Sequence, residues 1–74
     1  MAPSEYLSPD AAVGRSLRTL RRLAGLTLED VARIADTSTA YLSKVETGKF
    51  TPSRTYVAQV TRAIADSMTE TAAA

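Results

Sequence analysis

The 74-residue sequence predicts an all-α fold of four short helices, organised around a pair of helices joined by a tight turn between residues 27 and 48. Apolar residues recur at helical spacing in four separate stretches, and residues typical of helix caps stand between these stretches. A chain of this length forms one domain, which buries only about 60% of the surface that its unfolded form exposes. We therefore expect a helical domain over residues 9–66, with a flexible N-terminal arm over 1–8 and a flexible C-terminal tail over 67–74.

The first helix is expected to begin at Ser8, Pro9 and Asp10, which combine a capping side chain, a proline suited to the first helical position and an acid near the positive end of the helix dipole. It runs to about residue 24, because Gly25 is a typical helix-ending residue. Its inward stripe consists of Val13, Leu17, Leu20 and Ala24. Its outward arginines are Arg15, Arg18 and Arg22, whereas Arg21 lies at the edge of the stripe.

The second helix begins at Leu28, because Thr27 and Asp30 are spaced as a capping box in which the threonine hydroxyl accepts a first-turn amide. Its apolar face consists of Leu28, Val31, Ala32 and Ala35. Residues 36–38 are Asp, Thr and Ser, which prefer caps and turns to helix interiors. A tight turn is therefore expected here, with Ser38 as the cap of the next helix.

The third helix follows Ser38 and ends at Gly48, which supplies a left-handed stop. At about 100° per residue, its inner side carries Tyr41, Leu42, Val45 and Glu46. Its outer side carries Ala40, Ser43, Lys44 and Thr47. The inner side suits a core, and the outer side is small, polar and basic.

The fourth helix is expected to start near Pro52 or Ser53 and to fade near Asp66. Its inward residues are Tyr56, Val57, Val60 and Ile64, and its outward residues are Arg54, Gln59 and Arg62. In the loop before this helix, Phe50 is expected to pin the chain to the core. The sequence leaves open whether a fifth helix follows.

The spacing of these residues resembles the helix-turn-helix family of phage lambda repressor and Cro, also called the XRE family. The resemblance rests on GRSLRxLRxxxGLTxEDVAxxA from Gly14 to Ala35 and on SxxYLSKVExGxxxPS from Ser38 to Ser53. It covers roughly residues 13–65. It implies a lambda-repressor-like domain that acts as a small transcriptional regulator, of the phage or plasmid repressor and Cro type, on operator DNA. It also implies that a structural ion pair braces the first helix against the third, formed by Arg21 and Glu46.

Three positions depart from the family pattern. The family usually has glutamine where Leu28 stands, and that glutamine commonly contacts a phosphate or a neighbouring side chain, which leucine cannot do. Asp36 replaces the glycine of the turn and must enter the left-handed region, which aspartate tolerates better than most residues. Thr37 replaces an apolar residue, so we expect the turn to be less tightly anchored.

In a helix-turn-helix, the second helix of the pair enters the major groove and the first crosses the DNA backbone. The resemblance implies base readout by Thr39, Ala40, Ser43, Lys44 and Thr47. A lysine can donate to guanine O6 and N7, the hydroxyls can donate or accept, and an alanine methyl can contact a thymine methyl. This face lacks Arg, Asn and Gln, so DNA shape and phosphate contacts are expected to carry a larger share of recognition. The phosphate candidates are the amides of Thr27 and Leu28, together with Ser38, Tyr41, Lys49 and Arg54.

The charge distribution favours a polyanionic partner. The formal net charge is only +1, but all nine Lys and Arg lie between residues 15 and 62, against four acidic residues there, which gives this segment a charge of +5. The sequence has no histidine, no cysteine and no glycine-rich phosphate loop, so we expect no enzyme, no metal site and no cofactor. It shows no signal peptide and no apolar run near the ~20 residues of a membrane span, so we expect a cytoplasmic protein, nucleoid-associated when DNA-bound.

We expect a homodimer on double-stranded DNA, with half-sites about one helical turn, ~34 Å, apart. Leu23, Tyr56 and the tail are the candidate dimer surfaces. The same fold can instead serve as a protein-interaction module, such as an antitoxin or a regulator that acts through a protein partner. A protein-contact face typically exposes large aromatic or aliphatic residues. The outer side of the third helix has none and Leu23 is the one exposed aliphatic residue expected, so the sequence favours DNA.

Overall fold

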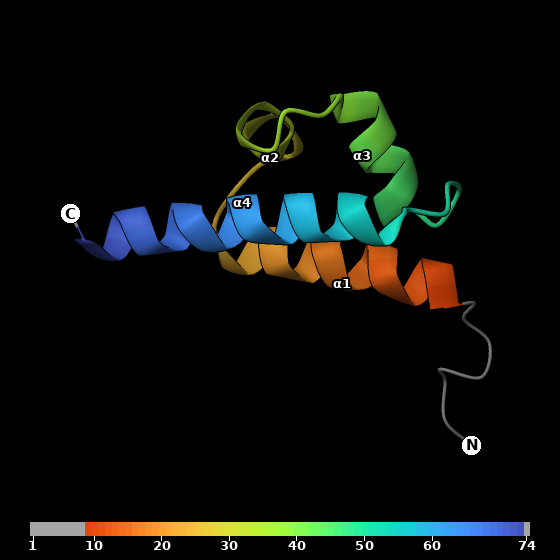
Figure 1. Ribbon diagram of the computed structural model, residues 1–74, viewed down its shortest axis with the longest axis horizontal. Coiled ribbons are helices and arrows are strands. Elements are labelled where there is room, and N and C mark those ends of the chain that lie inside the picture. The colour runs from red at the N-terminus through yellow and green to blue at the C-terminus, as the bar shows by residue number, and fades with distance from the viewer. Residues whose placement is uncertain (1–8, 74) are drawn as a thin grey trace, which may run out of the picture.

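The computed structural model describes residues 9–73, and over this range it has four helices and no strand. They are α1 (Pro9–Leu23), α2 (Leu28–Ile34), α3 (Thr39–Glu46) and α4 (Arg54–Ala73). α1 and α4 lie side by side, and α2 and α3 lie across the same side of this pair (Figure 1). The expected all-α fold is thus confirmed, whereas the arm expected over residues 1–8 lies outside the described residues.

The core lies where the four helices meet. Its buried apolar residues are Leu17, Val31, Ala32, Ala35, Leu42, Val45, Val60 and Ile64. Leu28 and Tyr41 are half-buried and pack against this cluster. Because fully burying one aliphatic side chain stabilises the fold by about 1.5–3 kcal/mol, these contacts are the main force that holds the helix pair on α1 and α4.

α1, α2 and α3 end in the same hydrogen-bonded motif, in which the chain becomes left-handed directly after the helix cap. The left-handed residues are Gly25 (φ 73°), Asp36 (φ 56°) and Gly48 (φ 81°). In each motif two successive amides donate back to carbonyls of the last helical turn, at N–O distances between 2.8 and 3.4 Å. The left-handed conformation expected of Asp36 is therefore present, in a motif that elsewhere in this fold uses glycine.

The inward side of α1 differs from the expected stripe at Leu20, which is 37% exposed. The cause is a close approach of α3 to the buried Gly14, where an added Cβ would lie only 2.0 Å from the Val45 carbonyl oxygen. α1 is therefore turned so that the line through Gly14 and Leu17 faces the core. Leu20 lies at the margin of that line and does not join the core cluster.

Of two expectations for the C-terminal half, one is wrong and the other holds in part. α4 does not fade near Asp66 but continues to Ala73, so the segment expected to be a tail is helical from residue 67 to 73. This segment contains neither Gly nor Pro, and its Met, Glu and Ala residues favour helix. Phe50 is 39% exposed and lies outside the core cluster, but its ring packs on that of Tyr41, with centroids 5.3 Å apart, and Tyr41 contacts the cluster.

Candidate nucleic-acid interface

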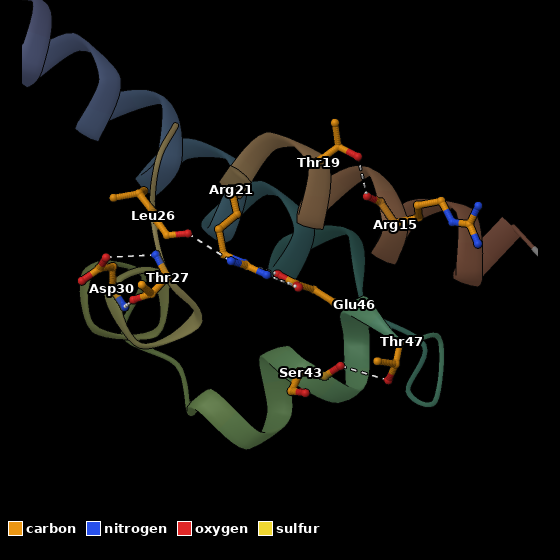
Figure 2. Close-up of polar contacts among 9 residues, drawn as sticks. All are labelled: Arg15, Thr19, Arg21, Leu26, Thr27, Asp30, Ser43, Glu46 and Thr47. Carbon is orange, nitrogen blue, oxygen red and sulfur yellow. Dashed lines mark hydrogen bonds and ion pairs between the residues drawn. The ribbon is translucent and has the colours of Figure 1, made fainter. Parts of the chain in front are cut away.

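Side-chain caps fix where α2 and α3 begin. Thr27 Oγ1 accepts from the Asp30 amide at 3.0 Å, and the Asp30 carboxylate accepts from the Thr27 amide at 2.9 Å (Figure 2). The backbone hydrogen bond from Thr27, with the side-chain one, holds the pKa of Asp30 below its usual value. At the start of α3, Ser38 Oγ accepts from the Tyr41 amide at 3.0 Å. Both helices therefore start where the capping residues of the sequence predict.

The turn between α2 and α3 is tied to α4 by two side chains. Tyr56 Oη and Thr37 Oγ1 are hydrogen-bonded at 3.0 Å, and Gln59 Nε2 donates to the Ala35 carbonyl. Burial raises the pKa of Tyr56, and its ring meets the ring of Tyr41 edge to face with centroids 5.0 Å apart. The turn is therefore anchored by polar contacts, contrary to the weak anchoring that we expected from the missing apolar residue.

A buried ion pair joins α3 to α1. Arg21 donates from Nε and Nη2 to the two carboxylate oxygens of Glu46, both at 2.9 Å, and from Nη1 to the Leu26 carbonyl at 3.0 Å (Figure 2). The two side chains are only 11% and 4% exposed. The hydrogen bond to Glu46 raises the pKa of Arg21, although burial opposes this. Together with the contact at Gly14, this pair fixes the distance and orientation of α3 on α1.

The opposite side of α3 is open to solvent. Ala40, Lys44 and Thr47 are exposed, whereas Thr39 and Ser43 are half-buried. The Thr47 hydroxyl donates to the Ser43 carbonyl at 3.0 Å, so its oxygen is left as an acceptor (Figure 2). The five residues expected to read bases thus share one side of the helix that the inner contacts hold in place.

The expected phosphate contacts differ in how they are placed. The Thr27 amide donates to the Asp30 carboxylate, so this amide is not free to hold a phosphate, and the carboxylate itself occupies the N-terminus of α2. The Thr27 hydroxyl accepts from the Asp30 amide and keeps its own proton as a donor. Lys49 is exposed and close to α3, since its amide donates to the Lys44 carbonyl at 2.8 Å. Arg54 is exposed and borders a groove between α1 and α4.

Three contacts of this site were not predicted from the sequence: the approach of Val45 to Gly14, the bond from Gln59 to Ala35, and the contact of Lys44 with Phe50. A glycine inside a helix destabilises it by about 1 kcal/mol relative to alanine. The presence of Gly14 in the first helix therefore indicated that another segment packs closely against it. The bond from Gln59 to Ala35 joins residues 24 positions apart, for which helical spacing gives no signal. The third contact is the Lys44 ammonium, which lies 5.0 Å from the ring centroid of Phe50.

Residues 9–73 contain no cluster of His, Cys, Asp and Glu able to hold a metal ion. Over the same range, none of the helices has the length and apolar character needed to cross a membrane.

Comparison with known proteins agrees with this architecture. A family model described as a helix-turn-helix domain matches residues 12–74. A similar solved structure is the crystal structure of the clp gene regulator ClgR from C. glutamicum, with 34% sequence identity and a TM-score of 0.72 over 86% of this chain and 87% of that chain. A search of curated proteins gives no significant match. Because the family model spans most of the sequence, the chain belongs to the helix-turn-helix domain family.

Proposed function

We propose that this protein is a sequence-specific DNA-binding transcriptional regulator whose α3 reads operator DNA in the major groove. The observation that carries the proposal is the division of α3 into two sides. Its inner side is fixed by Glu46 and by the close approach at Gly14, whereas its outer side exposes small polar residues and a lysine. A helix of about 10–12 Å diameter with such a face fits a major groove about 12 Å wide. Membership of the helix-turn-helix family and the similarity to a gene regulator support the proposal.

In this proposal the outer side of α3 reads base edges. Lys44 donates to guanine O6 or N7, and the Thr39 and Ser43 hydroxyls donate or accept. The Ala40 methyl contacts a thymine methyl, and Thr47 accepts from an amino group because its own proton is bound to the helix backbone. Each good base contact contributes about 1–3 kcal/mol of discrimination, so the set supports specific but moderate readout.

Phosphate contacts position the domain on the duplex. We assign this role to Lys49 and Arg54 as cations, and to Ser38 and Tyr41 as hydroxyl donors at the start of α3. Because the Asp30 carboxylate takes the Thr27 amide, the N-terminus of α2 contributes less than a free helix end would. Thr27 then offers its hydroxyl proton, and Leu28 offers its amide.

We further propose that the protein is a repressor of the Cro type, that it binds as a homodimer to half-sites ~34 Å apart, and that it works in the cytoplasm. It needs neither a metal ion nor a catalytic step for this task. The dimer doubles the contacts of one small domain, which suits a reading face without Arg, Asn or Gln.

A protein-interaction module is the second candidate. Leu23, at the end of α1, is 74% exposed and is the most exposed large apolar residue in the part of the chain that the structure describes. Large exposed aliphatic residues are typical of a protein-contact surface. In this candidate α1 contacts a protein partner and the outer side of α3 reads no sequence.

The test is selection of bound sequences from random DNA duplexes. The selected site and an unrelated duplex of equal length are then titrated at one salt concentration, because counterion release alone changes affinity by orders of magnitude. We expect a preference of about 10³ or more for the selected site. Equal binding of both duplexes would contradict sequence-specific readout, and binding of neither would favour the protein-interaction module.

A further inference from the structure

We propose that Phe50 is a positioning residue for base readout, which holds the Lys44 ammonium over its ring so that the lysine meets DNA already oriented. This inference rests on the proposed function of α3. It gives a role in specificity to a residue that lies outside the recognition helix and outside the core cluster.

The end of α3 brings the two residues together. Gly48 is left-handed, with φ 81°, and reverses the chain directly after the helix. The amides of Lys49 and Phe50 then donate to the carbonyl of Lys44, at 2.8 and 3.2 Å. Phe50 is thus hydrogen-bonded to Lys44 through the backbone, and the Lys44 ammonium lies 5.0 Å from the centre of the Phe50 ring. Both side chains are exposed, so the pair lies on the solvent-facing side of the domain.

The ring of Phe50 packs in turn against the ring of Tyr41. Its centroid lies 5.3 Å from that of Tyr41, and Tyr41 meets Tyr56 with centroids 5.0 Å apart. Tyr56 is hydrogen-bonded to Thr37 in the turn before α3. A chain of three aromatic rings therefore connects the turn before the recognition helix with the loop after it, and Lys44 lies at the open end of this chain.

No ion pair competes with the aromatic ring for the Lys44 ammonium in the part of the chain that the structure describes. Among the described residues the ion pairs join Arg21 to Glu46 and Arg33 to Asp30, and Lys44 takes part in neither. A lysine over an aromatic face is attracted by the negative charge of the π system. This attraction restricts a side chain that otherwise loses much rotamer freedom when it binds. Pre-orientation of this kind improves both the affinity and the discrimination of the base contact.

The inference predicts that Phe50 acts on DNA through Lys44 and not independently. Phe50→Leu keeps an apolar side chain but removes the π face. It should lower discrimination at the base pair that Lys44 reads by about two- to fivefold, as expected for an exposed cation–π contact. Phe50→Tyr keeps the π face and should preserve that discrimination.

The test is a double-mutant cycle on the site selected by the wild-type protein. The base pair read by Lys44 is the one whose preference relaxes in Lys44→Ala. Relative affinities for the four base pairs at this position are then measured for the wild type, Phe50→Leu, Phe50→Tyr, Lys44→Ala and the Lys44→Ala/Phe50→Leu double variant. We expect Phe50→Leu to reduce discrimination in the wild-type background and to change nothing further in the Lys44→Ala background. An equal loss in both backgrounds, or unchanged discrimination in Phe50→Leu, would overturn the inference.

A second measurement needs no DNA. The Lys44 ammonium lies over the Phe50 ring, 5.0 Å from its centroid. The NMR signals of the adjoining ε-methylene protons should therefore be shifted upfield in the free protein and should return to ordinary lysine positions in Phe50→Leu. Ordinary positions in the wild type would overturn the contact itself. If the wild type selected no DNA sequence, the proposed function would fail, whereas a selected site with a Phe50 effect independent of Lys44 would remove only this inference.

Discussion

The two sides of α3 are built in opposite ways. The inner side meets the rest of the fold at backbone distance next to Gly14 and through the Glu46 carboxylate, whose side chain is only 4% exposed. The outer side carries Ala40, Lys44 and Thr47 in solvent. A helix that is fixed on one side can present the other with little freedom to move. The inner residues therefore hold α3 in place, and the outer residues are the ones proposed to contact the bases.

The largest expected effect is on the inner side. Arg21→Ala leaves the Glu46 carboxylate buried without its partner, and the free energy of unfolding should fall by about 3–5 kcal/mol. Arg22→Ala, one residue along and exposed, should change it by less than about 0.5 kcal/mol. Urea denaturation of both variants measures the difference. Similar losses in both would show that the ion pair does not brace α3.

The close approach of α1 and α3 gives the second test. Gly14→Ala adds a Cβ where the Val45 carbonyl oxygen is 2.0 Å away, so the two helices must separate. We expect a loss of about 1–3 kcal/mol, although alanine is the better helix former by about 1 kcal/mol. Ser16→Ala, exposed on the same helix, is the control and should be neutral or slightly stabilising. A stabilised Gly14→Ala would mean that the helices are not in backbone contact.

On the outer side, substitutions should change DNA binding and leave stability alone. Lys44→Ala should remove about 1–3 kcal/mol of discrimination at one base pair. Lys49→Ala should weaken binding to all sequences about equally and reduce the salt dependence by the equivalent of about one phosphate contact. Titrations at several salt concentrations separate the two. The assigned roles fail if both variants lose specificity to the same extent.

The helix ends give a smaller effect. Asp36 adopts the left-handed conformation for which α1 and α3 use glycine, so Asp36→Gly should raise the free energy of unfolding by up to about 1 kcal/mol. Gly25→Ala is the matched opposite, because nothing lies within 4 Å of the added Cβ and only the backbone conformation is disfavoured. It should lower stability by about 1 kcal/mol. Thermal unfolding of the two variants should therefore shift in opposite directions, and shifts of the same sign would contradict the account.

The smallest effect concerns pH. Hydrogen bonds to Thr27 hold the pKa of Asp30 below its usual value in the folded protein. The capping box therefore contributes stability above the unfolded pKa of about 3.9, and this contribution is lost as the pH falls through the lower folded pKa. Asp30→Asn should reduce the loss of stability on acidification. If the free energy of unfolding of that variant fell as much on acidification as that of the wild type, the carboxylate would not stabilise the start of α2.

The features that the sequence predicted correctly are mostly local. The caps at Thr27 and Ser38 and the left-handed ends at Gly25 and Gly48 each depend on residues within one helical turn. Leu20 was placed wrongly because the rotation of α1 depends on a contact with α3, which periodicity on α1 alone does not report. The end of α4 was placed wrongly because small polar residues were taken as a tail although no helix breaker stands among them.

The candidate site shows the same division. The shared side of Thr39, Ser43 and Lys44 follows from helical spacing alone. The pairing of Thr27 with Asp30 follows from the capping box. That the Asp30 carboxylate takes the Thr27 amide, which was expected to hold a phosphate, is seen only in the structure. The ring of Phe50 over Lys44 depends on how the chain reverses at Gly48 and could not be predicted from spacing.

The central claim is that the outer side of α3 meets the bases. It is tested most directly by recording backbone amide NMR spectra of the protein during titration with its selected DNA site. We predict that the largest chemical-shift changes fall on residues 38–49, with smaller changes along the rest of the domain. Largest changes at the end of α1 around Leu23, with α3 unaffected, would contradict the claim.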